Sequence, residues 1–519
     1  MKMFKITVTA VIMGLTSVMA AGQIDAKPDT LMWKAEALGS VSSGDFSPYH
    51  ITALRHGRLS SSKTMLVEGS VCKPMTTDRY WDFGFGADII AGAGSAVDYE
   101  RYSASDHSWY LHPMRPSTAW VQQLYGEARW RSLFITVGLK EYTSPLVDEQ
   151  LSSGDLVFSG NTRPMPQLRV GFNDFQTIPF TRGFLQIQAE VGIGKRMDDK
   201  WMREHYNYYN YYLSQGEWMN YKRLYFRTDP SRPFSATIGA QVTAEFWGCV
   251  QNYSKGESNY ERKRPKSFGS LLRSIIPSGD GQEGFVEGNH LGSIDVKGTY
   301  RMRSGHTIKA YLSWPWEDGS GLGKLNGFDG LWGFEYRSPR RSWLNAAVVE
   351  YLNFTNHSGH IHINPDDWGD GFAALFPGHV SGSDDYYNHV EYNSYAYYGL
   401  SIGSPAFMAP LYNRDGYNRF IGNVMRGFHM AFTGSLSSTV DYTAKCSYRK
   451  AWGSGYFHLV EPIDESSFMV GVHWQLPRVK GLALNIDMEL DRGTMPGNTF
   501  GVALGVKWTG RSLANFTRR

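Results

Sequence analysis

A two-residue hydrophobic alternation, repeated along most of the chain, limits what this sequence can fold into. It is clearest in the segments 81–89, 184–193, 235–246, 482–490 and 500–508, where every second residue is apolar and those between are mostly polar or small. A period of two indicates β-strands that have one apolar face and one polar or small face. The sequence therefore predicts an all-β protein.

The same alternation would suit a soluble β-sandwich, so the length and flanks of the segments decide between the two. Several segments run to about ten residues, the length that a tilted strand needs to cross a bilayer. Aromatic residues lie at segment ends, for example Trp247, Trp314 and Trp508, which is typical of the interfacial girdle of a membrane barrel. These features favour a transmembrane antiparallel β-barrel.

The connections between segments are of two kinds. Tight turns are predicted at Arg131-Ser132, Asp229–Pro233, Ser304-Gly305, Ser338–Ser342 and Pro477–Gly481. Long polar loops are predicted at 92–118, 141–166, 195–221, 248–289, 315–329, 355–389 and 451–466. Short connections on one side and long ones on the other are the periplasmic and extracellular asymmetry of outer-membrane barrels. We therefore expect the protein in the bacterial outer membrane, in contact with its lipid.

The N-terminal region predicts export and sets the expected domain boundaries. Residues 1–20 have a basic start, an apolar stretch and small residues before a cleavage site, the layout of a signal peptide. We expect residues 21–79 to form an N-terminal periplasmic element and 80–519 to form the barrel. Parity then requires one more strand near 406–411, for a total of about 18; a strand at 64–71 is an alternative that shifts the count.

The sequence predicts no enzyme, metal site or cofactor. It lacks a Gly-x-Ser-x-Gly elbow and a phosphate-binding Gly-Lys-Ser/Thr loop. The segment His360–Asp370 holds two His and three Asp residues, but without a third ligand at motif spacing. A net charge of +3 does not argue for nucleic acid. Cys72, Cys249 and Cys446 lack metal-ligand spacing; they are interpreted as incidental, although one disulfide among them is possible.

Residues 146–195 contain specific short motifs in addition to the two-residue alternation. They contain Ser152-Ser153-Gly154-Asp155, Ser159-Gly160-Asn161 and Arg163-Pro164-Met165-Pro166-Gln167, with further matching residues at Gln122–Tyr125, Gly138, Asp384–Asn388 and Asn423–His429. This arrangement resembles the Wzi capsule-assembly family, over nearly the whole mature chain. The resemblance implies an 18-stranded outer-membrane barrel that acts as a lectin and helps to hold capsular polysaccharide at the cell surface. Some members carry an N-terminal helical bundle, for which 21–79 is short.

The resemblance also suggests which residues to examine. Motif residues expected in the lumen are Glu149, Asp155, Asn161, Arg163 and Gln167. For Glu149, Arg163 and Gln167 the favoured role is to wedge the lumen closed, and the alternative is to bind sugar. Polysaccharide contacts are expected among aromatic and acidic residues of the long loops: Trp314, Trp316, Asp366, Asp367, Trp368, Asp384, Asp385, Tyr386 and Tyr387. Aromatic faces stack on sugars, and carboxylates bond hydroxyls. The same residues could instead form the girdle and loop packing.

Two functions are preferred at this stage, and an outer-membrane enzyme, such as a lipase or a glycan-modifying barrel, ranks third. The first is an attachment protein that binds exported capsular or exopolysaccharide and retains it at the surface. The alternative is an outer-membrane saccharide porin, because a barrel of this size can leave an aqueous channel. The bulky 141–182 segment is long enough to enter the lumen and close it, which favours the first.

Overall fold

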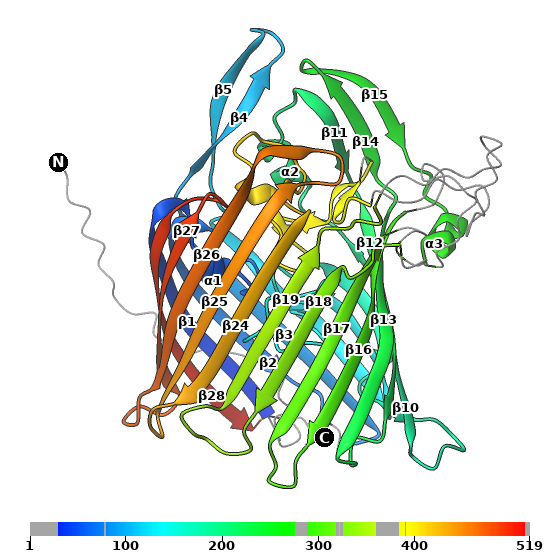
Figure 1. Ribbon diagram of the computed structural model, residues 1–519, viewed down its shortest axis with the longest axis vertical. Helices are drawn as coiled ribbons and strands as arrows, with labels where there is room; N and C mark the ends of the chain where they lie inside the picture. Colours follow the sequence, from blue (N-terminus) through cyan, green and yellow to red (C-terminus); the bar gives the residue numbers. More distant parts are fainter. Residues whose placement is uncertain are drawn as a thin grey trace.

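A computed structural model describes residues 30–76, 79–275, 288–317, 321, 325–359, 384–389 and 391–513 of this chain. The predicted signal peptide lies outside these residues. None of the helices in the described ranges is long and apolar enough to span a membrane. The dominant element is one large antiparallel sheet (Figure 1).

The sheet closes into a barrel. Its strands are β1 (Thr30–Phe46), β2 (Ser61–Lys73), β3 (Trp81–Gly94), β6 (Ala119–Trp130), β7 (Leu133–Leu139), β8 (Pro166–Phe172), β9 (Gln176–Thr177), β10 (Leu185–Lys195), β12 (Trp218–Thr228), β13 (Phe234–Phe246), β16 (Asn289–Arg301), β17 (Thr307–Glu317), β18 (Gly330–Arg337), β19 (Ala346–Phe354), β24 (Met425–Ser435), β25 (Val440–Gly453), β26 (His458–Gln475), β27 (Leu482–Gly493) and β28 (Thr499–Leu513). The short β9 follows β8 along the same partner, β10. Counting β8 and β9 as one, the barrel has 18 strands, and β1 pairs with β28 to close it.

The strand count agrees with the prediction, but two of its strands are not where the sequence placed them. β1 and β2 are barrel strands, in register at Met32 and Cys72, so the separate element predicted for 21–79 is wrong over 30–73. The alternation in β1 is blurred because Leu38 faces inward and packs against the lumen cluster that includes Leu66 and Ile51. The strand predicted at 406–411 is wrong: that stretch leads into a 3-10 helix, η1 (Pro410–Tyr412).

Outward-facing residues form the apolar band that the alternation predicted. On β24, Phe428, Met430 and Phe432 are exposed, while His429 and Ala431 between them are buried. The same pattern recurs around the sheet, and a band of exposed apolar side chains around a closed barrel is what a lipid-embedded surface requires. The three cysteines are all free.

The two ends of the barrel differ as the connector lengths predicted. All five predicted tight turns lie at one end of the barrel, and the long connections lie at the other. Counted from β1 with β8 and β9 as one strand, the odd-numbered strands begin at the tight-turn end. Two hairpins, β4 (Val97–Ser103) with β5 (Ser108–Met114) and β14 (Cys249–Ser254) with β15 (Glu257–Lys263), rise beyond the rim (Figure 1). We call the long-loop end extracellular and the other periplasmic. The loop predicted at 451–466 is wrong, because β25 and β26 extend across most of it.

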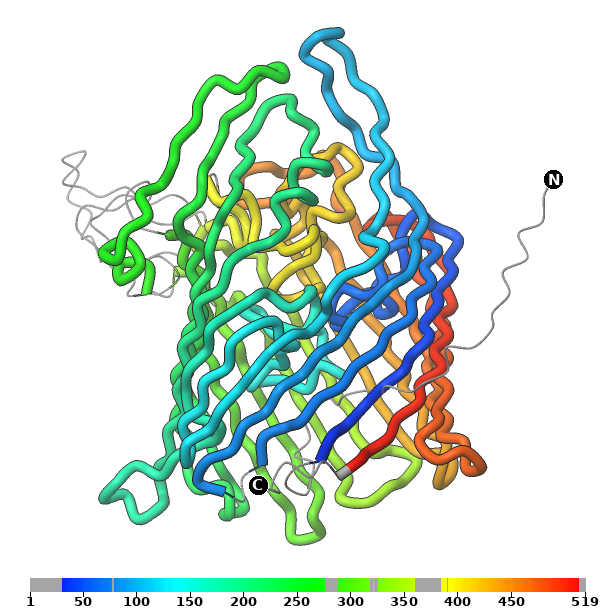
Figure 2. The backbone as a smooth tube through the Cα atoms, turned by 180° about the vertical axis from the view of Figure 1, so that it is seen from behind, coloured from blue at the N-terminus to red at the C-terminus, as the bar shows by residue number. Residues whose placement is uncertain are grey.

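The remaining elements belong to the extracellular loops or lie inside the barrel. The loops carry α2 (Asp199–His205), β11 (Asn210–Gln215), which pairs with β14, and α3 (Phe268–Ile275). Three segments enter the lumen: 47–60 with α1 (Tyr49–Thr52), 140–165, and the described part of 384–424 with β20 (Asn388–His389), β21 (Asn393–Ser394), β22 (Ala396–Tyr397), β23 (Leu400–Ser401) and η1. The yellow chain near residue 400 lies within the upper barrel in both views (Figures 1 and 2). We refer to these three segments as the plug.

Candidate functional site

The first plug segment is anchored by carboxylates of the barrel wall. The Glu489 side chain accepts hydrogen bonds from the backbone N–H groups of His50 and Ile51, each at 2.7 Å. Asp491 accepts from the Tyr49 N–H at 2.9 Å. These N–H groups belong to the first turn of α1 and have no partner within the helix, so the β27 carboxylates satisfy them.

The second plug segment reaches other parts of the wall. Gln241 on β13 donates to Asp155, and Leu151 packs against Val348 and Ala431 of β19 and β24. Around the ring, β13 lies opposite β27. The plug is therefore tied to opposite walls and crosses the lumen.

The motif residues that were expected in the lumen fall into two groups. Asp155 and Asn161 are buried in the plug; Asn161 accepts from the Leu54 N–H at 3.1 Å and donates to the Ser401 carbonyl at 2.9 Å, joining all three segments. Glu149 lies in the same segment and accepts from the Gly160 N–H at 2.9 Å. Burial raises the pKa of Glu149 to about 8.

The other two motif residues do not lie in the plug interior. Gln167 is a buried residue of the β8 wall, across from Gly194 of β10. Arg163 lies where the second plug segment returns to the barrel wall, at the extracellular mouth, where it lines a pocket. Because Leu168 beside it is exposed on the outer face, Gln167 faces the lumen from the wall. The lumen position that the resemblance implied therefore suits Glu149, Asp155, Asn161 and Gln167, and Arg163 needs a different explanation.

Four predicted polysaccharide contacts lie in or against the plug. Tyr386 and Tyr387 are 1% and 3% exposed and belong to the main apolar cluster inside the barrel. Asp384 is buried and accepts from Ser358, and Asp385 accepts from Asn423 at 2.8 Å. The prediction for the two tyrosines and Asp384 is corrected, because a buried side chain cannot reach a polymer; Asp385 is bonded within the plug.

Trp314 and Trp316 point away from the lumen. Their neighbour Ser313 faces inward and bonds Asp295 at 2.7 Å, so the even-numbered residues of β17 face outward. Trp314 donates to Asn326 at 2.7 Å, and Trp316 is 4% exposed. Both are therefore packed at the outer rim, which is the structural alternative left open above.

Asp366, Asp367 and Trp368 lie outside the described residues, as do His360, His362 and Asp370. Among the residues that the structure describes, no three His, Cys, Asp or Glu side chains gather as a metal site.

A pocket of about 470 Å³ opens at the extracellular mouth, a volume within the usual range for ligand sites. Its walls come from five regions that are distant in sequence: the β1–β2 connection, the base of the β4–β5 hairpin, Arg163 at the end of the second plug segment, the α2 region, and the plug around 397–411. Aromatic side chains in it include Phe46, Tyr99, Trp201, Tyr397 and Tyr398. We call it the mouth pocket.

Two aromatic rings of the mouth pocket are held in fixed positions. Trp201 stacks on His205, with ring centroids 4.7 Å apart and planes at 13°. Trp201 also contacts Gly399, where a Cβ atom would lie 2.3 Å from the ring, so only glycine fits. Tyr398 and Gly399 form the two-residue turn between β22 and β23, with φ of 50° and 77°. A tyrosine in this left-handed conformation carries strain, and the surrounding contacts hold its ring at the pocket.

Arg163 lies between aromatic rings at the same pocket. Its guanidinium carbon is 4.0 Å from the Trp120 ring centroid and 4.7 Å from that of Tyr398. One of its N–H groups donates to Ser117 at 3.2 Å. Burial lowers the pKa of Arg163 to about 10, so the group remains charged at neutral pH. The mouth pocket thus combines flat aromatic faces with a fixed cation.

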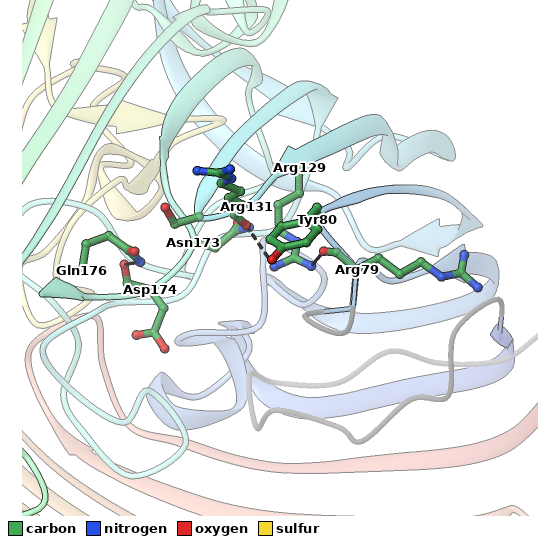
Figure 3. A pocket seen from close by; sticks show the side chains of 8 residues that line it. Arg79, Tyr80, Arg129, Arg131, Asn173, Asp174 and Gln176 are labelled. Carbon is green, nitrogen blue, oxygen red and sulfur yellow. Dashed lines mark hydrogen bonds between the residues drawn. The ribbon is translucent and has the colours of Figure 1, made fainter.

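A second, more open pocket of about 770 Å³ lies at the periplasmic end (Figure 3). Arg79, Tyr80, Arg129 and Arg131 line it. Arg129 is used structurally, since it donates to the carbonyls of Arg79 and Arg131 at 2.6 and 3.0 Å. This pocket faces away from the cell surface, so the mouth pocket is the better candidate for surface function.

The sequence did not point to Trp201 or Tyr398 as site residues. Trp201 lies in a loop that was predicted, and the aromatic-rich run 395–398 (YAYY) was a visible signal. What could not be predicted from the sequence is that these two loops meet beside Arg163, because five chain segments must fold before the pocket exists.

Comparison with known proteins bears on the fold. No family model matches the chain, and no curated protein sequence matches it. Among solved structures, it is similar to Escherichia coli Wzi, described as an outer membrane protein involved in group 1 capsule assembly and a carbohydrate-binding β-barrel, with 11% identity and a TM-score of 0.54, covering 91% of this chain and 83% of that one. Acinetobacter baumannii OccAB2 has 7% identity and a TM-score of 0.46 over 93% of this chain and 98% of that one. Pseudomonas aeruginosa OprD has 10% identity and a TM-score of 0.41 over 96% and 100%. At these identities the likeness concerns the fold alone, and this chain is an outer-membrane β-barrel.

Proposed function

We propose that this barrel binds polysaccharide at the cell surface and retains it there, without building or exporting it. The observation that carries the proposal is the mouth pocket, in which Trp201 and Tyr398 offer aromatic faces beside Arg163 on the extracellular side of a plugged lumen. Stacking of aromatic rings on the apolar faces of sugars, with polar groups bonding hydroxyls or acids, is how proteins hold saccharides.

The plug argues for retention over transport. Its segments are bonded to opposite walls, through Glu489 on β27 and Gln241 on β13, and the tyrosines between them are buried. A lumen occupied in this way offers a soluble sugar no wide path. The likeness of the fold to a solved barrel described as carbohydrate-binding is consistent with the proposal.

Weak contacts suffice for this role. A polymer presents the same unit many times, and many barrels share one cell surface, so binding is multivalent. A single pocket of modest affinity can therefore hold a long chain in place. The absence of any nucleotide-sugar motif in the sequence is in keeping with a passive binder.

Deleting the gene tests the proposal. We expect total polymer to stay near normal while polymer moves from the cells to the medium, and we expect the gene supplied in trans to restore the cell-bound fraction. A deletion strain that keeps a full cell-bound layer would overturn retention. A strain that stops making polymer would instead assign the protein to export or synthesis.

A further inference from the structure

The charges of the mouth pocket are unbalanced. Arg115, Arg163 and Lys200 line it, and Glu204 is the one acidic side chain among its described lining residues. Glu204 is already paired, since it lies one helical turn from Lys200 with a nitrogen–oxygen distance of 3.6 Å. The two arginines therefore have no carboxylate within ion-pair distance in the described part of the chain.

Arg163 differs in this respect from other poorly exposed arginines of the protein. Arg196, for example, is almost fully buried and lies within 3.2 Å of oxygens of Asp198, Glu217 and Glu245. A partly buried guanidinium without an acid costs free energy, because the two aromatic faces and the single Ser117 hydroxyl replace only part of its lost hydration. A ligand that supplies the missing anion would offset this desolvation cost.

The Arg163 side chain is also fixed before any ligand arrives. Trp120 and Tyr398 flank the guanidinium, and Trp120 is itself held by a 2.7 Å hydrogen bond to Gln122. Gly57, with φ of 68°, packs so close that a Cβ atom there would lie 2.9 Å from Arg163 Cγ. A guanidinium that is already fixed in position loses less conformational entropy when it binds a planar acid.

We infer that the mouth pocket takes an anionic sugar unit, with Arg163 pairing with its carboxylate or phosphate and Trp201 stacking on a neighbouring ring. This inference rests on the proposed function and adds the class of saccharide. Arg115, which is exposed at the pocket rim, contributes a second positive charge. The shared chemistry is an oxyanion on the polymer, either a sugar acid or a phosphate substituent.

The test uses purified full-length protein in detergent and the surface polysaccharide of the host bacterium in three forms: native, carboxyl-reduced, and dephosphorylated. Affinity is measured by calorimetry for the wild type, Arg163→Gln, Arg163→Lys and Arg115→Gln. Arg303→Gln, which removes one exposed positive charge from a periplasmic turn, is the matched control. Gel mobility of unheated and heated samples shows whether each variant still folds into the barrel.

We expect the wild type to bind the native polymer and to lose about tenfold or more in affinity for whichever treated form lacks its anion. Arg163→Gln should lose a similar factor on the native polymer and no longer discriminate, Arg163→Lys should lie between, and Arg115→Gln should lose less. Arg303→Gln should bind as the wild type does. Since Arg115 is exposed, its variant keeps the test valid if Arg163→Gln fails to fold.

The inference is overturned if the wild type binds the native and both treated polymers equally, or if folded Arg163→Gln binds the native polymer normally. If Arg163→Gln does not fold, normal binding by Arg115→Gln overturns it. In each of these cases polysaccharide binding itself, and so the proposed function, still stands. If the wild type binds none of the three forms, the proposed function fails as well, and the two failures are thus distinguishable.

Discussion

The Nε2 group of Gln241, on the wall strand β13, donates to both carboxylate oxygens of Asp155 in the plug, at 3.2 and 3.0 Å. Both residues are fully buried. A buried hydrogen bond contributes about 0.5–1.5 kcal/mol, and Gln241 is the wall donor to Asp155, whose other hydrogen bonds come from Ser144 and the Val157 N–H of the plug itself. This contact is therefore one of the points that hold the plug against the wall.

Replacing Gln241 with Leu should loosen the plug. We expect the variant to lose about 0.5–1.5 kcal/mol of plug anchoring and to show frequent openings in planar bilayers. The control is Gln251→Leu, which removes a partly exposed amide from an extracellular hairpin. If the two variants behave alike, Gln241 does not anchor the plug.

The wild-type protein should conduct little in the same bilayers. The three plug segments are joined to one another through Asn161, which bonds Leu54 in the first segment and Ser401 in the third. They therefore form one body that occupies the lumen. Large, steady currents that added sugars block would contradict this and favour the saccharide porin.

Trp201→Ala should weaken polymer retention without opening the barrel. The change removes a stacking face, worth about 1 kcal/mol, so we expect roughly a fivefold loss of affinity and more polymer in the medium. Trp343→Ala is the control, because Trp343 is 74% exposed in a periplasmic turn. Equal retention in the two variants would remove Trp201 from the site.

Tyr387→Ala should act on stability, in contrast to Trp201→Ala. The ring is 3% exposed and packs against Phe407 and Phe420, with centroids 4.6 and 5.3 Å away. Truncation of a buried aromatic costs about 3–5 kcal/mol. We expect the temperature at which the folded band is lost on gels to fall, and Tyr387→Phe to fall much less. An unchanged transition in Tyr387→Ala would contradict a structural role.

Much of the barrel could be predicted because lipid and lumen impose opposite polarities on alternate residues. The prediction failed where that contrast is weak. In β1, Leu38 faces a lumen that the plug has made into an apolar core, so the inward side is no longer polar. The stretch 406–411 failed for the converse reason: Ala406, Phe407 and Ala409 are apolar because they are plug core, and they form no strand.

The site was less predictable than the fold. Arg163 could be singled out by motif, but its neighbours Trp120, Trp201 and Tyr398 come from three other parts of the chain. Aromatic and acidic residues in long loops looked alike in the sequence, whether they lie at the mouth or in the plug. Only the folded positions separate Trp201, which lines a pocket, from Tyr386, which is buried.

The protonation of Glu149 should make the plug sensitive to pH. Burial raises the pKa of this carboxyl from 4.5 to about 8, and the nearby Asp155 adds to the shift. Between these values the folded plug binds more protons than the unfolded chain, so its stability is fully present below pH 4.5 and decreases as pH rises through 8. Each pKa unit corresponds to about 1.4 kcal/mol; because Glu149 is only partly buried, solvent screening reduces the expected loss to about 2 kcal/mol or less.

Glu149→Gln isolates this effect. The amide keeps an oxygen that can accept from the Ser144 and Gly160 N–H groups, as Glu149 Oε1 does at 3.1 and 2.9 Å, but it cannot lose a proton. We expect wild-type channels to open more often at pH 9 than at pH 5 in planar bilayers, and the variant to show a much smaller difference. Other acids of the plug, such as the buried Asp155, remain in both proteins, so the difference between them reports the loss of the Glu149 carboxyl, including its effect on Asp155. Identical pH profiles would mean that the Glu149 carboxyl is already ionised in the folded plug.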